Sequence, residues 1–117
     1  MTGTGTEELL TVGAVARLAG VTVRTLHHYD EIGLVSASGR SPAGYRLYDD
    51  GDLDRLHAVL AYRELGFGLE DIAELVAGEA EPLAHLRRQH ALVRSRIDHL
   101  TRLLGALEKT MEAHMSG

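Results

Sequence analysis

Residues 21–34, VTVRTLHHYDEIGL, bring arginine, hydroxyl and imidazole side chains onto one short segment. Guanidinium groups bind phosphate oxygens, and hydroxyl and imidazole groups hydrogen-bond to phosphates or to the edges of nucleic-acid bases. Thr22 is a typical helix N-cap, and Val23, Leu26 and Asp30 then share one face of a helical wheel. The opposite face carries Arg24, Thr25, His28 and Tyr29. We therefore predict a short helix whose polar outer face suits nucleic acid.

A second short helix is predicted before this segment. Thr11 offers an N-cap hydroxyl, apolar residues follow at helical spacing, and Gly20 ends the helix. The apolar positions are Val12, Val15, Ala16 and Ala19. Two short helices that meet at a glycine turn are typical of a helix-turn-helix, whose second helix enters the major groove of DNA. Arg24 is then expected to anchor a phosphate.

The next segment predicts a two-stranded β-hairpin, or wing. Leu34–Val35 and Tyr45–Tyr48 are short extended runs, and the sequence SASGRSPAG between them is rich in glycine, serine and proline. Positive charge and a hydroxyl donor on this wing would come from Arg40, Tyr45 and Arg46. Tyr48 is expected to pack in the sheet rather than to contact a ligand.

Two more helices are predicted after the hairpin. Asp49 and Asp52 resemble a capping box for the first of them, which Gly66 closes. The second runs from about residue 69 to residue 77, and Gly78 stops it. The first helix carries the apolar residues Leu53, Leu56, Leu60 and Leu65, and the second is expected to point Ile72, Leu75 and Val76 inward.

The rest of the chain predicts one long helix. Pro82 suits the first helical turn, and no further proline interrupts the sequence to about His114. Alternating steps of four and three residues define a heptad seam in which seven of eight positions are apolar. The seam consists of Leu86, His90, Val93, Ile97, Leu100, Leu104, Leu107 and Met111. Such a helix, roughly 50 Å long, is too long for a core this small to cover, so it is expected to pair with another helix, with His90 setting the register.

Composition and sequence patterns limit the functional classes to which the protein can belong. The 117 residues contain no cysteine and carry a net charge of −5, but residues 12–48 hold four arginines against two acids. No run reaches the roughly 18 apolar residues of a membrane span, and the first residues do not resemble a signal peptide. The sequence shows neither a catalytic constellation nor the histidine spacing of a helical metal site. We expect no enzyme activity, no cofactor and no metal.

From Leu10 to about Gly78 the sequence resembles the DNA-binding domain of the MerR family of transcription regulators. The resemblance rests on VGAVARLAGVTVRTLHHYDEIGLV, GYRLYDDGDLDRL and RELGFGLEDIAEL, which occur in order and without large gaps. With the long helix it extends over about nine tenths of the chain. It implies a mainly α fold: a winged helix-turn-helix with a small β-hairpin wing, a second helix pair and a long C-terminal antiparallel coiled-coil helix.

The resemblance also implies a mechanism. Members of the family bind pseudo-palindromic promoter DNA as homodimers, and activators bend and untwist it so that RNA polymerase finds both promoter elements in register. The positions that match DNA contacts of the family are Arg24, His28, Tyr29, Tyr45, Arg46 and Arg63. Many members have Arg-Tyr-Tyr where this chain has His27-His28-Tyr29, so the base preference cannot be transferred.

The complete set of predicted DNA contacts is Arg24, Thr25, His27, His28, Tyr29, Arg40, Tyr45, Arg46 and Arg63. Two of these have alternatives. His27 could border the core instead of contacting a phosphate, and His28 could simply be solvated. Of the two acids in this region, Asp30 is expected to pair within the chain and Glu31 to be solvated.

The predicted domains are a flexible tail over residues 1–8, the DNA-binding domain over 9–80 and the dimerisation helix over 81–117. The resemblance implies an effector domain beyond that helix, so we expect the sequence to be a fragment, a short product that lacks the sensor, or a regulator that answers to no small ligand. Expected partners are double-stranded promoter DNA, a second copy of the chain and RNA polymerase, in the cytoplasm and at the nucleoid. The alternative is a coiled-coil protein-interaction module whose winged helix binds no DNA. Arginines gathered on one surface would favour DNA.

Overall fold

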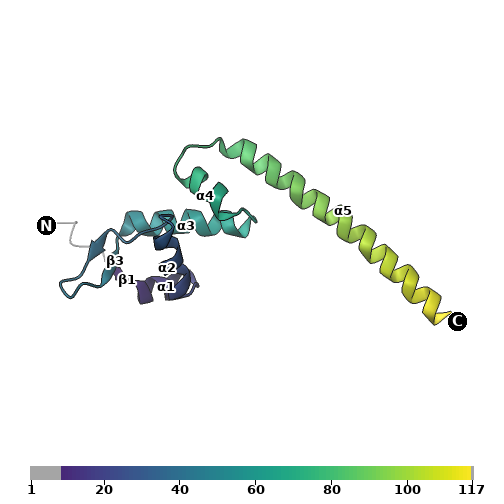
Figure 1. The fold of residues 1–117 in the computed structure, drawn as a ribbon, viewed down its shortest axis with the longest axis horizontal. Helices are drawn as coiled ribbons and strands as arrows, with labels where there is room; N and C mark the ends of the chain where they lie inside the picture. Colours follow the sequence, from purple (N-terminus) through teal and green to yellow (C-terminus); the bar gives the residue numbers. More distant parts are fainter. Residues whose placement is uncertain (1–8, 117) are drawn as a thin grey trace. The chain divides into compact units, whose positions relative to one another are not determined.

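The computed structural model describes residues 9–116, and most of them are helical (Figure 1). The elements in chain order are β1 (Leu10–Thr11), α1 (Val12–Ala19), α2 (Val23–Glu31), β2 (Gly39–Arg40), β3 (Arg46–Tyr48), α3 (Asp50–Glu64), α4 (Leu69–Val76) and α5 (Pro82–Met115). They form two compact units, of which the first ends at Ala77 and the second begins at Gly78 and holds α5. The predicted flexible tail, residues 1–8, lies outside the described residues.

Helices α1 and α2 begin where their caps predict. The Thr11 hydroxyl accepts a hydrogen bond from the Ala14 N–H at 3.3 Å, and the Thr22 hydroxyl accepts one from the Thr25 N–H at 3.0 Å. Between the helices Gly20 adopts a φ of 71°, a left-handed conformation that is easy only for glycine. The turn packs α2 against α1 (Figure 1), which confirms the predicted helix-turn-helix.

The wing belongs to a three-stranded antiparallel sheet in which β3 lies between β1 and β2. The predicted hairpin strand at Leu34–Val35 is wrong. The N–H groups of Leu34 and Val35 donate to the Tyr29 carbonyl at 2.8 and 3.2 Å, so these residues close the end of α2. The first wing strand is β2 instead. The sequence does not predict β1, because two residues are too few to show an alternating pattern.

The core of the first unit is built from aliphatic and aromatic side chains. Its largest fully buried members are Val15, Leu26, Val35, Tyr48, Val59 and Ile72. The burial of Tyr48 confirms that it packs in the sheet. Leu65 is 52% exposed, because Gly66, with a φ of 91°, turns the chain just after α3. Phe67 is buried instead, and its ring meets that of Tyr62 edge to face with 5.7 Å between the ring centres.

Hydrogen bonds to the Asp52 side chain connect the segment before β2 to the start of α3. Its carboxylate accepts hydrogen bonds from the Ser38 N–H (2.8 Å), the Ser38 hydroxyl (2.6 Å) and the Asp49 N–H (3.0 Å). The Asp49 carboxylate in turn accepts one from the Asp52 N–H at 2.8 Å, which confirms the predicted capping box. Burial raises the pKa of Asp52, but the hydrogen bonds from Ser38 and Asp49 outweigh burial, and the pKa lies below its ordinary value.

Asp52→Asn is expected to lower the free energy of unfolding by about 1–3 kcal/mol at neutral pH, because an amide cannot accept all three hydrogen bonds. The folded pKa is below the unfolded one, so this stabilisation is complete above the unfolded pKa and is lost as the pH falls through the folded pKa. Urea unfolding at neutral and at strongly acidic pH should show the difference between wild type and variant shrink in acid. Asp54→Asn, at an exposed acid of the same helix, is the control and should change little. A difference that is equal at both pH values would contradict this role.

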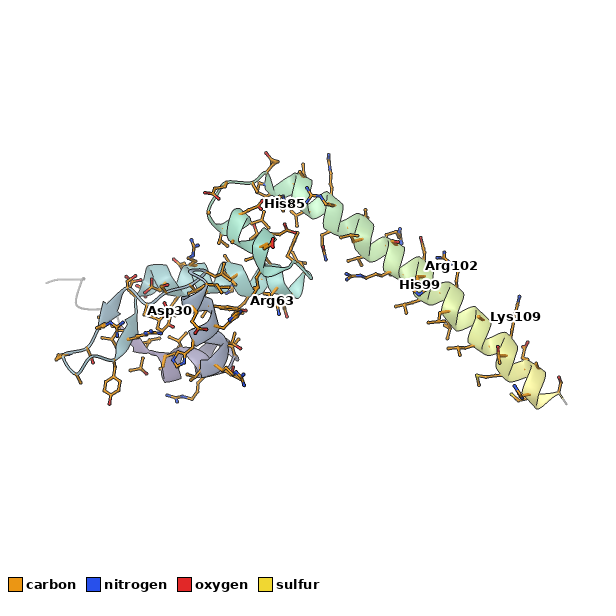
Figure 2. The ribbon with its side chains drawn as sticks, in the orientation of Figure 1. Asp30, Arg63, His85, His99, Arg102 and Lys109 are labelled. Atoms are coloured by element: carbon orange, nitrogen blue, oxygen red, sulfur yellow. The ribbon has the colours of Figure 1, made fainter. Side chains whose placement is uncertain are left out.

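Helix α5 begins at Pro82, as predicted, and continues to Met115. Within the described chain its apolar seam residues remain exposed, from 38% at Leu86 to 60% at Leu100, and His90 is exposed as well. Side chains stand out along the whole helix (Figure 2). No helix among residues 9–116 is long and apolar enough to cross a membrane.

Candidate nucleic-acid interface

Helix α2 buries one face and exposes the other. Leu26 is fully buried, whereas Arg24, His27 and His28 are exposed. Thr25 is half-buried, and its hydroxyl lies 2.9 Å from the Thr22 hydroxyl at the helix cap. Three predicted contact residues of α2 therefore face solvent, and a fourth is engaged in the cap.

The prediction that Tyr29 points outward is wrong. Tyr29 is only 5% exposed, and it follows Leu26 by three residues, so both side chains lie on one face of α2. Val23, which was expected on the inner face, is 37% exposed. The buried face is therefore centred between Leu26 and Tyr29, and a DNA contact by the Tyr29 hydroxyl stays a prediction.

One surface hollow joins α2 to the wing. It has a volume of about 260 Å³ and is lined by Thr11, Val12, His27, Arg40, Gly44, Tyr45 and Arg46. His27 and Arg46, together with Glu31, also line a second hollow. Four of the nine predicted contact residues thus meet in one place, and Tyr45 stands there 70% exposed. His27 borders the wing on the solvent side rather than the core.

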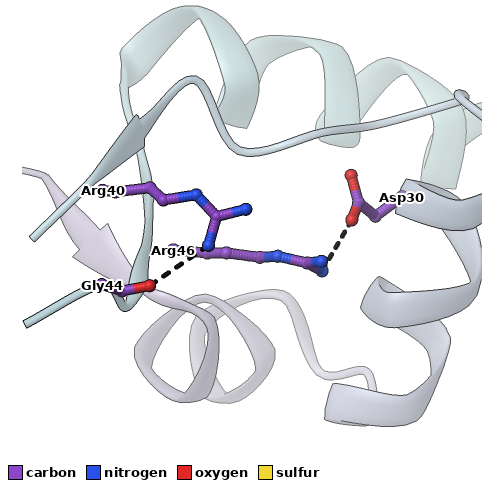
Figure 3. Close-up of polar contacts among 4 residues, drawn as sticks. All are labelled: Asp30, Arg40, Gly44 and Arg46. Atoms are coloured by element: carbon purple, nitrogen blue, oxygen red, sulfur yellow. Dashed lines mark hydrogen bonds and ion pairs between the residues drawn. The ribbon is translucent and has the colours of Figure 1, made fainter.

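An ion pair links α2 to the wing beside this hollow (Figure 3). Nη1 of Arg46 lies 2.6 Å from Oδ2 of Asp30, which confirms that Asp30 pairs within the chain. The Arg46 side chain nevertheless keeps 37% of its surface exposed. Glu31 is exposed, as predicted. The Asp30 carboxylate also acts on Tyr48: burial first, and Asp30 second, raise the pKa of the Tyr48 hydroxyl.

Arg40 is held within the wing itself. Its Nη1 donates a hydrogen bond to the Gly44 carbonyl at 3.1 Å (Figure 3). Gly44 has a φ of 92°, which lets the wing tip fold back toward Arg40. The Gly44 carbonyl thus restrains the side chain of Arg40, and the Asp30 carboxylate restrains that of Arg46.

Arg63 does not line the wing hollow. The Arg63 side chain is exposed near the end of α3 (Figure 2). Arg63 borders a separate groove of about 770 Å³ between α1 and α3, with Val15, Leu56 and Leu60 among its apolar lining. Its role as a phosphate contact stays a prediction.

Sequence reasoning missed three residues of the hollow, Thr11, Val12 and Gly44. Thr11 and Val12 lie at the start of α1, where backbone N–H groups lack helical partners and favour anions. The N-cap signal at Thr11 locates this helix end, but only the fold shows that the end opens toward the arginines of the wing.

Comparison with known families decides the classification. The model of the MerR helix-turn-helix regulatory proteins matches residues 10–79. The chain belongs to the MerR family. A second model of that family, described as MerR, DNA binding, matches residues 53–112. This MerR chain is 57% identical over 107 residues to the HTH-type transcriptional activator TipA of Streptomyces coelicolor, which covers 91% of the chain and 42% of TipA. It therefore spans about two fifths of the length of that relative.

Solved structures of MerR proteins share the fold. The N-terminal region of the Bacillus subtilis multidrug transporter activator, MtaN, superposes with a TM-score of 0.78 at 35% identity, covering 87% of this chain and 97% of that one. HiNmlR, a MerR family regulator lacking the sensor domain and bound to promoter DNA, gives a TM-score of 0.61 at 27% identity over 83% of this chain and 79% of its own. The mainly α, winged helix-turn-helix fold predicted from the sequence is confirmed.

Proposed function

We propose that this MerR chain is a sequence-specific DNA-binding transcription regulator that grips promoter DNA as a homodimer. The observation that carries the proposal is the hollow in which Arg40, Arg46, His27 and Tyr45 meet beside the exposed face of α2. These side chains offer guanidinium, imidazole and hydroxyl donors on one surface, the chemistry that phosphate oxygens require. The promoter-bound state of the related HiNmlR supports the same assignment.

Charge distribution agrees with DNA as the ligand despite the net charge of −5. Residues 12–48 contain four arginines and only two acids, and Asp30 is already paired with Arg46. The excess of acids lies later in the chain, where residues 49–54 alone carry four. The surface formed by α2 and the wing is therefore locally positive, and local charge governs counterion release on binding.

In this proposal α2 enters the major groove. The exposed Arg24 and His28 reach phosphates and base edges, and the wing arginines and Arg63 hold the flanking backbone. Activation follows if contacts at both ends of the site hold a bend and an untwist in the middle. Such deformation costs about 1–6 kcal/mol, which the phosphate contacts must offset.

Dimerisation is proposed to use the exposed seam of α5. Apolar side chains from Leu86 to Met111 are open along one stripe, and a second copy of the same helix running antiparallel would cover them. We infer that residues 9–80 bind DNA and 81–117 dimerise. RNA polymerase would then act on the distorted promoter, at the nucleoid in the cytoplasm, and the chain itself would have no enzyme activity.

Arg46→Ala is expected to weaken binding to any duplex by about tenfold, since it removes a charge-assisted phosphate contact. It should also reduce the slope of log affinity against log salt by about one unit per protomer, hence about two for the dimer. Fluorescence anisotropy with a labelled duplex across a salt series measures both. The loss leaves Asp30 unpaired on the same surface, which adds repulsion.

Arg102→Ala is the matched control, because it removes the same charge from α5 outside the predicted seam. It should leave both affinity and slope unchanged. Equal behaviour of the two variants would contradict the assignment of the wing hollow. A wild-type chain that binds no duplex at any salt concentration would favour the protein-interaction module.

A further inference from the structure

Two guanidinium groups face each other across the wing. Arg40 of β2 is the direct partner of Arg46 of β3 in the antiparallel ladder. Like charges at directly opposed positions destabilise a strand pair. Contacts that hold the two guanidinium groups apart would therefore stabilise the wing.

The structure shows two different restraints (Figure 3). Arg40 is bound by the Gly44 carbonyl, an atom of the wing itself, whereas Arg46 is bound by the Asp30 carboxylate on α2. The second contact thus crosses from the wing to the proposed recognition helix. It draws Arg46 away from Arg40 and fixes the wing against α2.

A carboxylate beside a phosphate-binding surface can affect the affinity for DNA in two opposite ways. By charge alone, Asp30 repels phosphate and neutralises Arg46, so its removal should tighten binding. By geometry, Asp30 orients Arg46 before DNA arrives, so its removal should weaken binding, because a free arginine loses side-chain entropy on ordering.

The observed contact favours the second interpretation. A carboxylate engages at most two of the five N–H donors of a guanidinium, so donors remain for a phosphate. The Arg46 side chain is still 37% exposed and lines both hollows beside His27, so it remains accessible to a phosphate.

We propose that Asp30 is a positioning residue for DNA binding: its ion pair with Arg46 sets the wing and the recognition helix as one preformed phosphate-binding surface. This inference rests on the proposed function. The acid in the recognition helix thus serves affinity despite carrying the same charge as the ligand.

The test is duplex binding by Asp30→Asn in the full chain. With a fluorescein-labelled duplex of mixed sequence as the probe, we expect affinity to fall by roughly threefold to tenfold. Glu31→Gln tests charge alone: Glu31 is exposed and lines the second hollow with Arg46, but the ion pair of Arg46 is made with Asp30. Removing this charge takes away repulsion of phosphate without disturbing the ion pair, so this variant should bind more tightly than wild type.

Two further variants separate positioning from loss of fold. Asp30→Glu keeps the carboxylate and should restore binding to within about twofold of wild type. In the Arg46→Ala background, Asp30→Asn should no longer weaken binding, because there is no guanidinium left to orient. Thermal unfolding of each variant verifies that binding is measured on folded protein.

Binding by Asp30→Asn that equals or exceeds wild-type binding would overturn this inference and leave the proposed function standing. The same holds if Glu31→Gln weakens binding as much as Asp30→Asn does. A wild-type chain that fails to bind the duplex overturns both proposals.

Discussion

Leu100→Asp is expected to convert the proposed dimer into a monomer. Leu100 lies in the middle of the predicted α5 seam and is 60% exposed in the described chain, and the proposal has a second copy cover it. In a symmetric pair the variant places one carboxylate from each copy in the apolar seam, where an unpaired charge is very unfavourable. Sedimentation equilibrium of wild type and variant at one concentration measures the change.

Ser95→Asp serves as the control for this variant. It adds the same charge to an exposed position of α5 on the side away from the predicted seam, and it should leave the dimer intact. Loss of the dimer should also lower the affinity for a DNA site with two half-sites far more than the affinity for one half-site. In the dimer, binding of the first half-site makes binding of the second intramolecular, and a monomer loses this advantage. A Leu100→Asp chain that still sediments as a dimer would mean that the seam is wrongly assigned.

Tyr29→Ala is expected to lower the free energy of unfolding of the first unit by about 3–5 kcal/mol, because it leaves a cavity where a buried aromatic ring lies. That loss is a large part of the stability of a small domain. Urea denaturation followed by circular dichroism measures it. Tyr29→Phe should retain both stability and DNA affinity if the residue is part of the core.

His28→Ala provides the comparison within α2. His28 is exposed, so its removal should change stability by less than about 0.5 kcal/mol while weakening DNA binding. The two neighbouring residues thus separate core from interface. A Tyr29→Phe variant that stays fully stable but loses DNA affinity would show that the hydroxyl contacts DNA after all.

Helix ends were predictable from the sequence because their causes are local. Thr11, Thr22 and Asp49 each cap the backbone within three residues, and Pro82 sets the start of α5. These contacts do not depend on the rest of the fold. The existence of α5 was likewise predictable, since a heptad pattern from Leu86 to Met111 favours one long helix, while the pairing of its seam stays a prediction.

The orientation of α2 was not predictable to the same degree. A helix of nine residues offers few positions to define a face, and the helical wheel predicts Val23, Leu26 and Asp30 on the inner side. Packing against the rest of the unit instead centres the buried face between Leu26 and Tyr29. Tertiary contacts, which a wheel does not contain, decide that rotation.

In the candidate site, too, local features were predictable and tertiary contacts were not. The sequence predicts which types of side chain form the site, and it predicts that Asp30 pairs within the chain. The partner of Asp30 was not predictable, because Asp30 and Arg46 are sixteen positions apart and meet only through the packing of the wing on α2. Two-residue strands also give no periodic signal, so the cross-strand opposition of Arg40 and Arg46 required the register of the sheet.

In the proposed complex, two copies of this chain read one DNA duplex through α2 and the wing. This can be measured by sequencing the fragments that the purified chain selects from a random DNA pool. We expect an inverted repeat with a fixed centre, since a twofold dimer presents two identical α2 helices at a set separation. A pool without enrichment, or one enriched only in single half-sites at variable spacing, would contradict the proposed complex.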